Sequence, residues 1–211
     1  MRPILVLGAT EFSVEIADVA SDAGYEIAGF VVNEVSQAPG STLVGLPVHW
    51  IDDVAPLAAS HDAVCGLGTT TRSRFVHDAT ARGLGFATVV HPSSRVSSTS
   101  TLGEGTVVAP GAIVAAHTTI GRHVLLNRGA LVGHHTTIGD FASIQSGANV
   151  AGLCRIGEAA YVAMGALVLN TVSVGSRAVV GAGSVVTVDV PDRVKVLGVP
   201  ARVVEEGIEG K

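Results

Sequence analysis

Aromatic residues are scarce in this chain, and cysteine and charged residues are also few. Phe, Trp and Tyr make up 4% of the 211 residues, whereas glycine occurs 26 times. A core without large rings must be built from closely stacked Val, Ile, Leu and Ala, and the 47% hydrophobic content is sufficient for it. The composition therefore predicts a globular protein with an unusual core.

The low content of charge and cysteine excludes several classes of protein. Thirteen basic against eighteen acidic residues, with no basic run, leave no electrostatic footprint for nucleic acid. Two cysteines, Cys65 and Cys154, are too few for a disulfide framework and indicate a reducing cytoplasm. No apolar run approaches the ~20 residues that span a bilayer, and the opening MRPILVLGAT enters a strand-like segment without a secretory signal. We expect a cytoplasmic protein that contacts no membrane.

A six-residue period dominates the second half of the chain. An aliphatic residue recurs at every sixth position without a slip, and a small or β-branched residue usually follows four positions later, as at Ala130 and Thr136. The aliphatic positions are Val96, Leu102, Val108, Val114, Ile120, Leu126, Val132, Ile138, Ile144, Val150, Ile156, Val162, Val168, Val174, Val180 and Val186. Glycine adds a longer period of 18 residues, as at Gly121, Gly139 and Gly157. Three hexads therefore form one coil.

These two periods predict a triangular parallel β-helix over residues 92–211. Each hexad is a short strand plus a corner, and glycine relieves backbone crowding at particular corners. Coils stack at the strand spacing of roughly 4.8 Å, so residues 18 apart lie above one another. The handedness of the coil does not follow from the period.

Residues 1–91 follow a different pattern, in which apolar strands alternate with helical segments. We expect strands at 4–8, 26–32, 62–68 and 86–90 and helices near 12–23 and 70–83, hence a small Rossmann-like parallel sheet. The boundary is placed near Pro92. At the end of the first strand, Gly8 makes the turn, and the following helix start offers free N–H groups to an anion. The same residues also suit an ordinary strand-turn-helix junction.

Motifs along nearly the whole chain resemble one family. GFVVNE (29–34), CGLGTTTR (65–72), VVHPSSRVS (89–97), LNRGALVGHH (126–135) and VLGVPAR (196–202) stand in its order and spacing. The chain resembles the hexapeptide-repeat sugar O- and N-acetyltransferases of the sialic-acid and UDP-4-amino-sugar (bacillosamine) type. The resemblance implies left-handed coils, acetyl-CoA as co-substrate without a metal, and a sugar or nucleotide-sugar acceptor. It also implies homotrimers with active sites between the coils of neighbouring subunits.

The family's site residues are carried over onto matching positions. His134 takes the place of the general base, which suits imidazole chemistry because an attacking amine or hydroxyl must lose a proton. His135 stands where the family has an acidic neighbour and cannot supply a fixed negative charge. The acetyl-CoA positions are Ser143, Gly152, Met164 and Ala182, with the Gly152 N–H as a candidate oxyanion donor. The acceptor positions in the N-terminal unit are Gly8, Thr10, Glu11, Phe12, Ser13, Asn33, Glu34 and Gly68.

Two other interpretations remain open at this point. A γ-type carbonic-anhydrase-like enzyme uses the same coil and holds zinc with three histidines, for which His117, His134 and His135 are candidates. The chain is alternatively a scaffold without catalytic activity. Independently of these alternatives, we expect His117, His123 and His135 to be surface residues of the coils.

Overall fold

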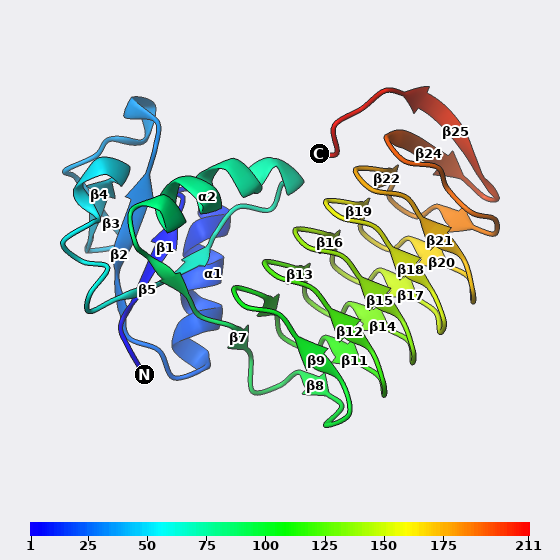
Figure 1. Cartoon of the computed structure of the whole chain (residues 1–211), viewed down its shortest axis with the longest axis horizontal. Helices are drawn as coiled ribbons and strands as arrows, with labels where there is room; N and C mark the ends of the chain where they lie inside the picture. The colour runs from blue at the N-terminus through cyan, green and yellow to red at the C-terminus, as the bar shows by residue number, and fades with distance from the viewer. The chain divides into compact units, whose positions relative to one another are not determined.

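The six-residue period folds into stacked coils in the computed structural model, which describes residues 1–211 except for the side chain of Gln37. The chain divides into two units, one of residues 1–68 and 72–91 and the other of 69–71 and 92–211. Figure 1 shows the coils of the second unit stacked in chain order, from green to red. Strands 18 residues apart pair in parallel and in register, as Leu125 does with Ser143. The predicted parallel β-helix is therefore confirmed.

The coils form three faces, each of them one sheet. The first face contains β10 (Val107–Val108), β13 (Leu125–Leu126), β16 (Ser143–Ile144), β19 (Tyr161–Val162), β22 (Val179–Val180), β24 (Val194–Gly198) and the antiparallel β25 (Ala201–Glu206). The second face contains β8 (Arg95–Val96), β11 (Ile113–Val114), β14 (Leu131–Val132), β17 (Asn149–Val150), β20 (Leu167–Val168) and β23 (Val185–Val186). The third face contains β9 (Thr101–Leu102), β12 (Thr119–Ile120), β15 (Thr137–Ile138), β18 (Arg155–Ile156) and β21 (Ser173–Val174).

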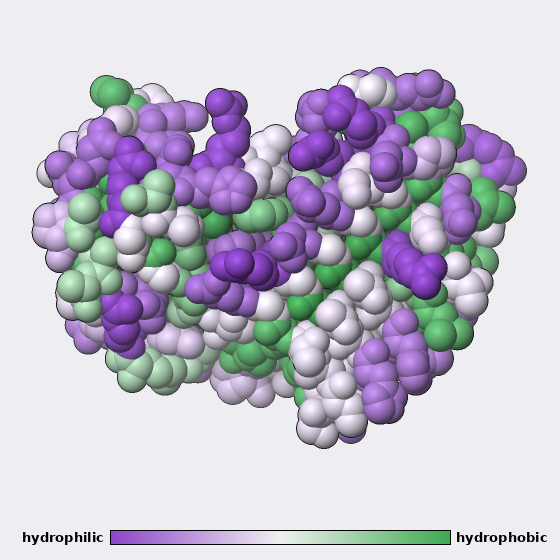
Figure 2. Space-filling view, viewed as in Figure 1, coloured by the Kyte–Doolittle hydropathy of each residue, from purple (hydrophilic) through white to green (hydrophobic). Residues whose placement is uncertain are grey.

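The core of the second unit is the column of aliphatic residues that the period marks. Leu126, Ile144 and Val162 are completely buried, as are the small residues Ala130 and Ala148 that alternate with them. One long and one small inward side chain per hexad fill the narrow prism without aromatic rings. The outer surface in the view of Figure 2 carries a hydrophobic band along the coils between neutral and charged side chains.

Two kinds of glycine shape the corners for different physical reasons. A Cβ on Gly139 would lie 2.7 Å from the amide nitrogen of Glu158, so the adjacent coil leaves no room for a side chain. Gly147 has open space around it but a φ of +67°, a left-handed conformation that only glycine adopts without strain. The predicted crowding explains the first kind, and backbone conformation explains the second.

The first unit is a six-stranded sheet with a helix after β1 and another after β5. Its order is β3 (Thr42–Leu43), β4 (Leu46–Trp50), β2 (Ile27–Val32), β1 (Ile4–Leu7), β5 (Asp62–Cys65), β6 (Gly85–Phe86). All neighbours are parallel except the β3–β4 hairpin. The unit also has α1 (Glu11–Asp22), α2 (Ser73–Ala81), β7 (Val89–Val90) and 3-10 turns Val35–Gln37 and Ile51–Asp53, and a third turn, Thr70–Arg72, crosses the unit boundary.

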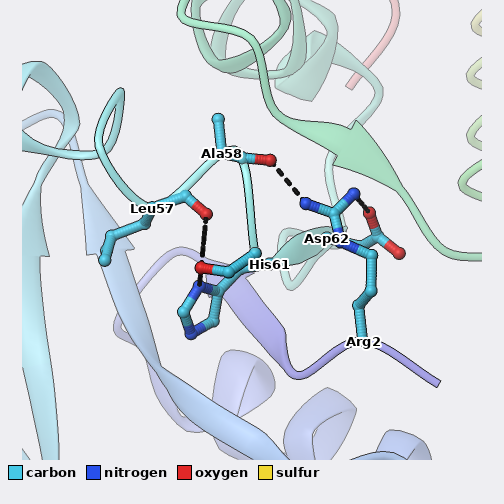
Figure 3. A network of polar contacts seen from close by, with 6 residues as sticks. Arg2, Leu57, Ala58, His61 and Asp62 are labelled. Atoms are coloured by element: carbon cyan, nitrogen blue, oxygen red, sulfur yellow. Dashed lines mark hydrogen bonds and ion pairs between the residues drawn. The ribbon is translucent and has the colours of Figure 1, made fainter.

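The structure refines the predicted elements of this unit. The strand expected at 62–68 ends at Cys65, and the segment 86–90 divides into β6 and β7. The hairpin of β3 and β4 was not predicted, although Val44 and Gly45 between its strands both have positive φ, as a tight hairpin turn requires. Arg2, just before β1, connects to the start of β5: it donates to the Asp62 carboxylate at 2.7 Å and to the Ala58 carbonyl at 2.5 Å (Figure 3).

Candidate active site

His134 and His135 occupy the corner between the second and third faces, here called the histidine corner (residues 115–118, 133–136, 151–154 and 169–172). Both side chains are exposed, and their Nδ1 atoms lie 3.1 Å apart in hydrogen-bond contact. The rings are edge-on, with an interplanar angle of 85°. Because one Nδ1 must donate and the other accept, the two imidazoles have complementary tautomers.

The backbone of the corner is held by the adjacent coils. The His135 amide donates to the Ala116 carbonyl at 3.0 Å, and the His134 carbonyl accepts from Leu153 at 2.8 Å. Gly152 lies one coil further, where a Cβ would be 2.8 Å from the Nε2 of His134. The structure thus brings His134, His135 and Gly152 together, and only glycine at 152 leaves room for the imidazole.

His117 extends the histidine group by one coil. Its ring centroid lies 4.9 Å from that of His135, in the 18-residue register that the sequence predicts. His123 differs from the expected surface residue, because it is 6% exposed and stacks on Phe141 at 5.0 Å between centroids. The structure corrects that prediction: Phe141, one coil further, and neighbouring groups cover the ring.

Two of the predicted acetyl-CoA residues line a cavity of about 450 Å³ at the C-terminal coils. Met164 and Ala182 both lie at the corner between the first and second faces, 18 residues apart, and both are exposed. Tyr161, Lys195 and Leu197 are among the other lining residues. The cavity therefore combines apolar walls with a few polar groups, as small-molecule sites do.

The charged groups of this cavity were not predicted from the sequence. Lys195 lies 3.5 Å from the carboxylate of Glu205, and Lys211 lies 5.1 Å from the ring centroid of Tyr161. Burial raises the pKa of Tyr161. Lys195 and Glu205 belong to β24 and β25, which follow the last hexad, so the six-residue period contains no signal that could have found them.

Ser143 lies outside the histidine corner and does not line the cavity, although it pairs with the lining residue Tyr161 between β16 and β19. It is fully buried on β16, in the first face, and the histidine corner lies across the triangular prism from that face. Within one chain, its hydroxyl is therefore not adjacent to His134.

The predicted acceptor residues gather at one edge of the sheet in the first unit. Gly8 and Gly68 follow β1 and β5, and Asn33 and Glu34 follow β2. Because these neighbouring strands are parallel, their carboxyl ends meet at the same edge, where open α/β sheets bind ligands. A Cβ on Gly68 would lie 3.5 Å from the ring of Phe12, which brings those two residues into contact.

Thr10 and Ser13 have structural roles at the start of α1. Thr10 is the N-cap and forms a capping box with Ser13, and the Ser13 hydroxyl donates to the Gly66 carbonyl at 3.0 Å. Ser13 is completely buried. Its hydroxyl is thus used to connect α1 to the segment that follows β5. Glu11 and Asn33 are exposed.

Arg72 is a further residue that the sequence did not single out. Its side chain is 3% exposed, and burial lowers its pKa to about 10. Burial also raises the pKa of the Cys65 thiol, and the positive charge of Arg72 partly opposes that rise. A buried guanidinium near the end of a central strand is uncommon, yet the motif CGLGTTTR gives no sign of its burial.

Comparison with solved structures relates this geometry to known enzymes. A perosamine N-acetyltransferase from Caulobacter crescentus in complex with CoA and GDP-perosamine has a TM-score of 0.89 and 27% identity, covering 97% of each chain. The acetyltransferase domain of PglB from Neisseria gonorrhoeae, in complex with acetyl coenzyme A, has a TM-score of 0.87 and 29% identity, covering 96% of this chain and 99% of that one. WeeI from Acinetobacter baumannii has 0.87 and 26%, covering 97% and 100%.

The structural neighbours of this chain are hexapeptide-repeat sugar N-acetyltransferases. The resemblance to sugar acetyltransferases identified from the sequence motifs is confirmed, and the chain is an acyltransferase. No protein-family model matches it, and no curated protein matches it in sequence. In this acyltransferase, no described helix is long and apolar enough to span a membrane. The described residues also contain no group of three or more His, Cys, Asp or Glu side chains suited to a metal ion.

Proposed function

We propose that the chain is an acetyl-CoA-dependent acetyltransferase that acts on an amine or hydroxyl of a sugar or nucleotide-linked amino sugar, with His134 as general base. The observation that carries the proposal is the exposed His134, whose Nδ1 is held by His135 and whose ring packs over Gly152. The neighbours that bind CoA together with GDP-perosamine support the substrate class.

The reaction requires two proton transfers, one from the acceptor to His134 and one from His134 to the leaving thiolate. The acceptor nitrogen or oxygen attacks the thioester carbon, and His134 takes its proton at Nε2. The C–S bond then breaks, and the same proton passes to the departing thiolate to give CoA. A positioned base of this kind contributes roughly 10²- to 10⁴-fold. We assign oxyanion stabilisation to the Gly152 N–H, which lies beside the base.

The cavity beside Met164 and Ala182 is the proposed location of part of acetyl-CoA. Lys195 supplies a cation on its wall, which suits a phosphate-bearing coenzyme, and Leu197 supplies an apolar surface. Because the cavity and the histidine corner lie on different edges of one prism, we propose that a site is completed by two copies of the chain.

A homotrimer fits the unequal faces of the prism. The second face carries exposed Ile113, Leu131 and Leu167, whereas the third carries Thr119, Thr137 and Arg155 at the equivalent outward positions. Burying an apolar row between copies is favourable at about 25 cal/mol per Å². We therefore place the second face in the interface of the trimer, with left-handed coils as the resemblance implies.

The first unit is the proposed acceptor-binding domain, of Rossmann-like type. The carboxyl edge of its parallel sheet carries Gly8, Thr10, Phe12, Asn33, Glu34 and Gly68. We propose that the acidic Glu11 and Glu34 face the sugar hydroxyls or amine and that backbone N–H groups at the start of α1 face the diphosphate. The unpaired thiols of Cys65 and Cys154 suit the cytoplasm.

Thiol release from acetyl-CoA tests the proposal. The purified chain is given GDP- and UDP-linked 4-amino sugars, free sialic acids and small alcohols, with a His134→Ala variant in parallel. We expect release with a nucleotide-linked amino sugar and its near loss in the variant. No release with any acceptor, together with stoichiometric bound zinc, would favour the carbonic-anhydrase-like alternative, and full transfer by His134→Ala would exclude His134 as base.

A further inference from the structure

The contact between His134 and His135 has an unusual requirement. Two neutral imidazoles share one hydrogen bond between their Nδ1 atoms, at 3.1 Å, so only one of these atoms carries a proton. If His134 Nδ1 donates, its Nε2 has a lone pair and can take a proton from an acceptor. If His134 Nδ1 accepts, its Nε2 carries the proton and the ring cannot act as a base. The tautomer of His135 therefore decides whether His134 is competent.

We propose that His135 is a positioning residue that accepts the Nδ1 proton of His134 as a neutral imidazole, in the place where a carboxylate would otherwise stand. This inference rests on the proposed function of His134 as base. In the competent pair, His134 is protonated at Nδ1 and His135 at Nε2. The hydrogen bond leaves His134 Nε2 available for the attacking group.

His117 is the other titratable group that faces this pair. Its ring packs 4.9 Å from His135, and its amide donates to the Thr99 hydroxyl at 3.1 Å, which fixes the backbone of that coil. In the part of the chain that the structure describes, no Asp, Glu, Lys or Arg side chain pairs with these three imidazoles. The pair therefore has no fixed charge to orient it, and the geometry of the corner has to do so.

Replacing a carboxylate by an imidazole changes the response to acid. A single proton added to the pair silences the base, because every favourable arrangement of three protons on two rings places one on His134 Nε2. Activity therefore requires that both rings be neutral.

Position 135 allows a matched pair of variants. In His135→Asp, a carboxylate oxygen takes the place of Nδ1 and only accepts hydrogen bonds, and Asp tolerates the left-handed backbone, whose φ is 54°. In His135→Leu, no acceptor remains. The backbone tolerates Leu as well, because Leu153 occupies the same place in the next coil with a φ of 63°. The two variants differ in the acceptor and not in the fold.

With one acceptor sugar, we expect His135→Asp to keep kcat within about threefold of the wild type. We expect His135→Leu to lower kcat by at least about tenfold, because without its partner the His134 ring also adopts the tautomer that cannot act as a base. Equal kcat in His135→Leu and the wild type would overturn the proposal.

Nitrogen-15 NMR of the imidazoles provides a readout that does not depend on transfer. Assigned by comparison with His134→Ala, the neutral wild type should show His134 protonated at Nδ1 and bare at Nε2. A proton on Nε2 would overturn the inference even in an active enzyme. If the predicted tautomer is seen and no acceptor is acetylated, the proposed function fails while the inference about the pair stands.

Discussion

His135 and His123 occupy the same place in two different corners of the coil. Each is the third residue after an aliphatic position, and their φ values are 54° and 53°. His135 lies between His117 and Leu153 of the adjacent coils and is exposed. His123 lies between Gly105 and Phe141 and is 6% exposed. The backbone and the residue type are identical, and the surroundings differ.

The difference shows that the left-handed position does not mark a functional site by itself. Most non-glycine residues avoid this conformation, which costs roughly 1–2 kcal/mol. The coils nevertheless place Leu153, Thr171, Ala159 and Arg177 in it. What distinguishes His135 is its contact with another exposed imidazole. His123 instead fills space between coils, which is a packing role.

The largest expected effect concerns catalysis. His134→Ala should lower kcat by roughly 10²- to 10⁴-fold, because it removes the base. His123→Ala should leave kcat per folded molecule unchanged, since its ring stacks on Phe141 and not on His134. Steady-state rates, corrected for the folded fraction by circular dichroism, check both. A comparable loss of kcat in His123→Ala would break the division between the two histidines.

The next effect concerns stability, for which we expect the larger loss in His123→Ala and not in His134→Ala. His123→Ala should lower the free energy of unfolding by about 2–4 kcal/mol, because truncation of a buried ring leaves a cavity against Phe141. His134→Ala, at an exposed position, should change it by less than about 0.5 kcal/mol. Urea unfolding followed by far-UV circular dichroism gives both values. A stable His123→Ala variant would mean that the Phe141 contact contributes little.

The backbone part of the comparison can be isolated at Gly147. A Cβ there meets no atom within 4 Å, so Gly147→Ala adds only the strain of a left-handed φ, about 1 kcal/mol. Gly139→Ala is the contrasting variant, because its Cβ would meet the backbone of the next coil. We expect it to be the less stable of the two in thermal unfolding. Equal melting temperatures would show that the coils can separate to admit a methyl group.

The smallest expected effect is on the stability of the exposed pair. His135→Leu should alter the free energy of unfolding by no more than about 0.5 kcal/mol, because the left-handed strain remains and little packing is lost. Its kcat should nevertheless fall, as argued above. Denaturant titration of the same preparation used for kinetics tests this separation. A large loss of stability would make the kinetic result a consequence of misfolding.

The two units differ in how much of them the sequence predicts. In the second unit, each aliphatic residue of the period points into the core, because a strand of two residues plus a corner repeats without insertion. The first unit has no repeat, so β4 was missed and the end of β5 was placed three residues late. The turn glycines Gly66 and Gly68 follow directly on a buried strand, and hydrophobicity alone does not show where pairing ends.

The candidate site was predictable in its members more than in its arrangement. LVGHH predicted the adjacent histidines, and the 18-residue register predicted the stacking of His117 with His135. The sequence did not predict that the Nδ1 atoms of His134 and His135 meet or that Ser143 faces a different side of the prism. Nor did it predict the hydrogen bond from Ser13 to Gly66. Each of these depends on a side-chain direction or on a contact between segments distant in sequence.

By itself, the sequence determined the coil, its register and the column in which each residue of the hexads lies, since residues 18 apart stack in a three-sided parallel helix. It also determined the family resemblance through its motifs. Only the tertiary structure decided which of two equivalent histidines is covered by a neighbouring ring and which faces solvent beside a partner. Burial and hydrogen bonding are properties of the surroundings, and the repeat specifies only the position.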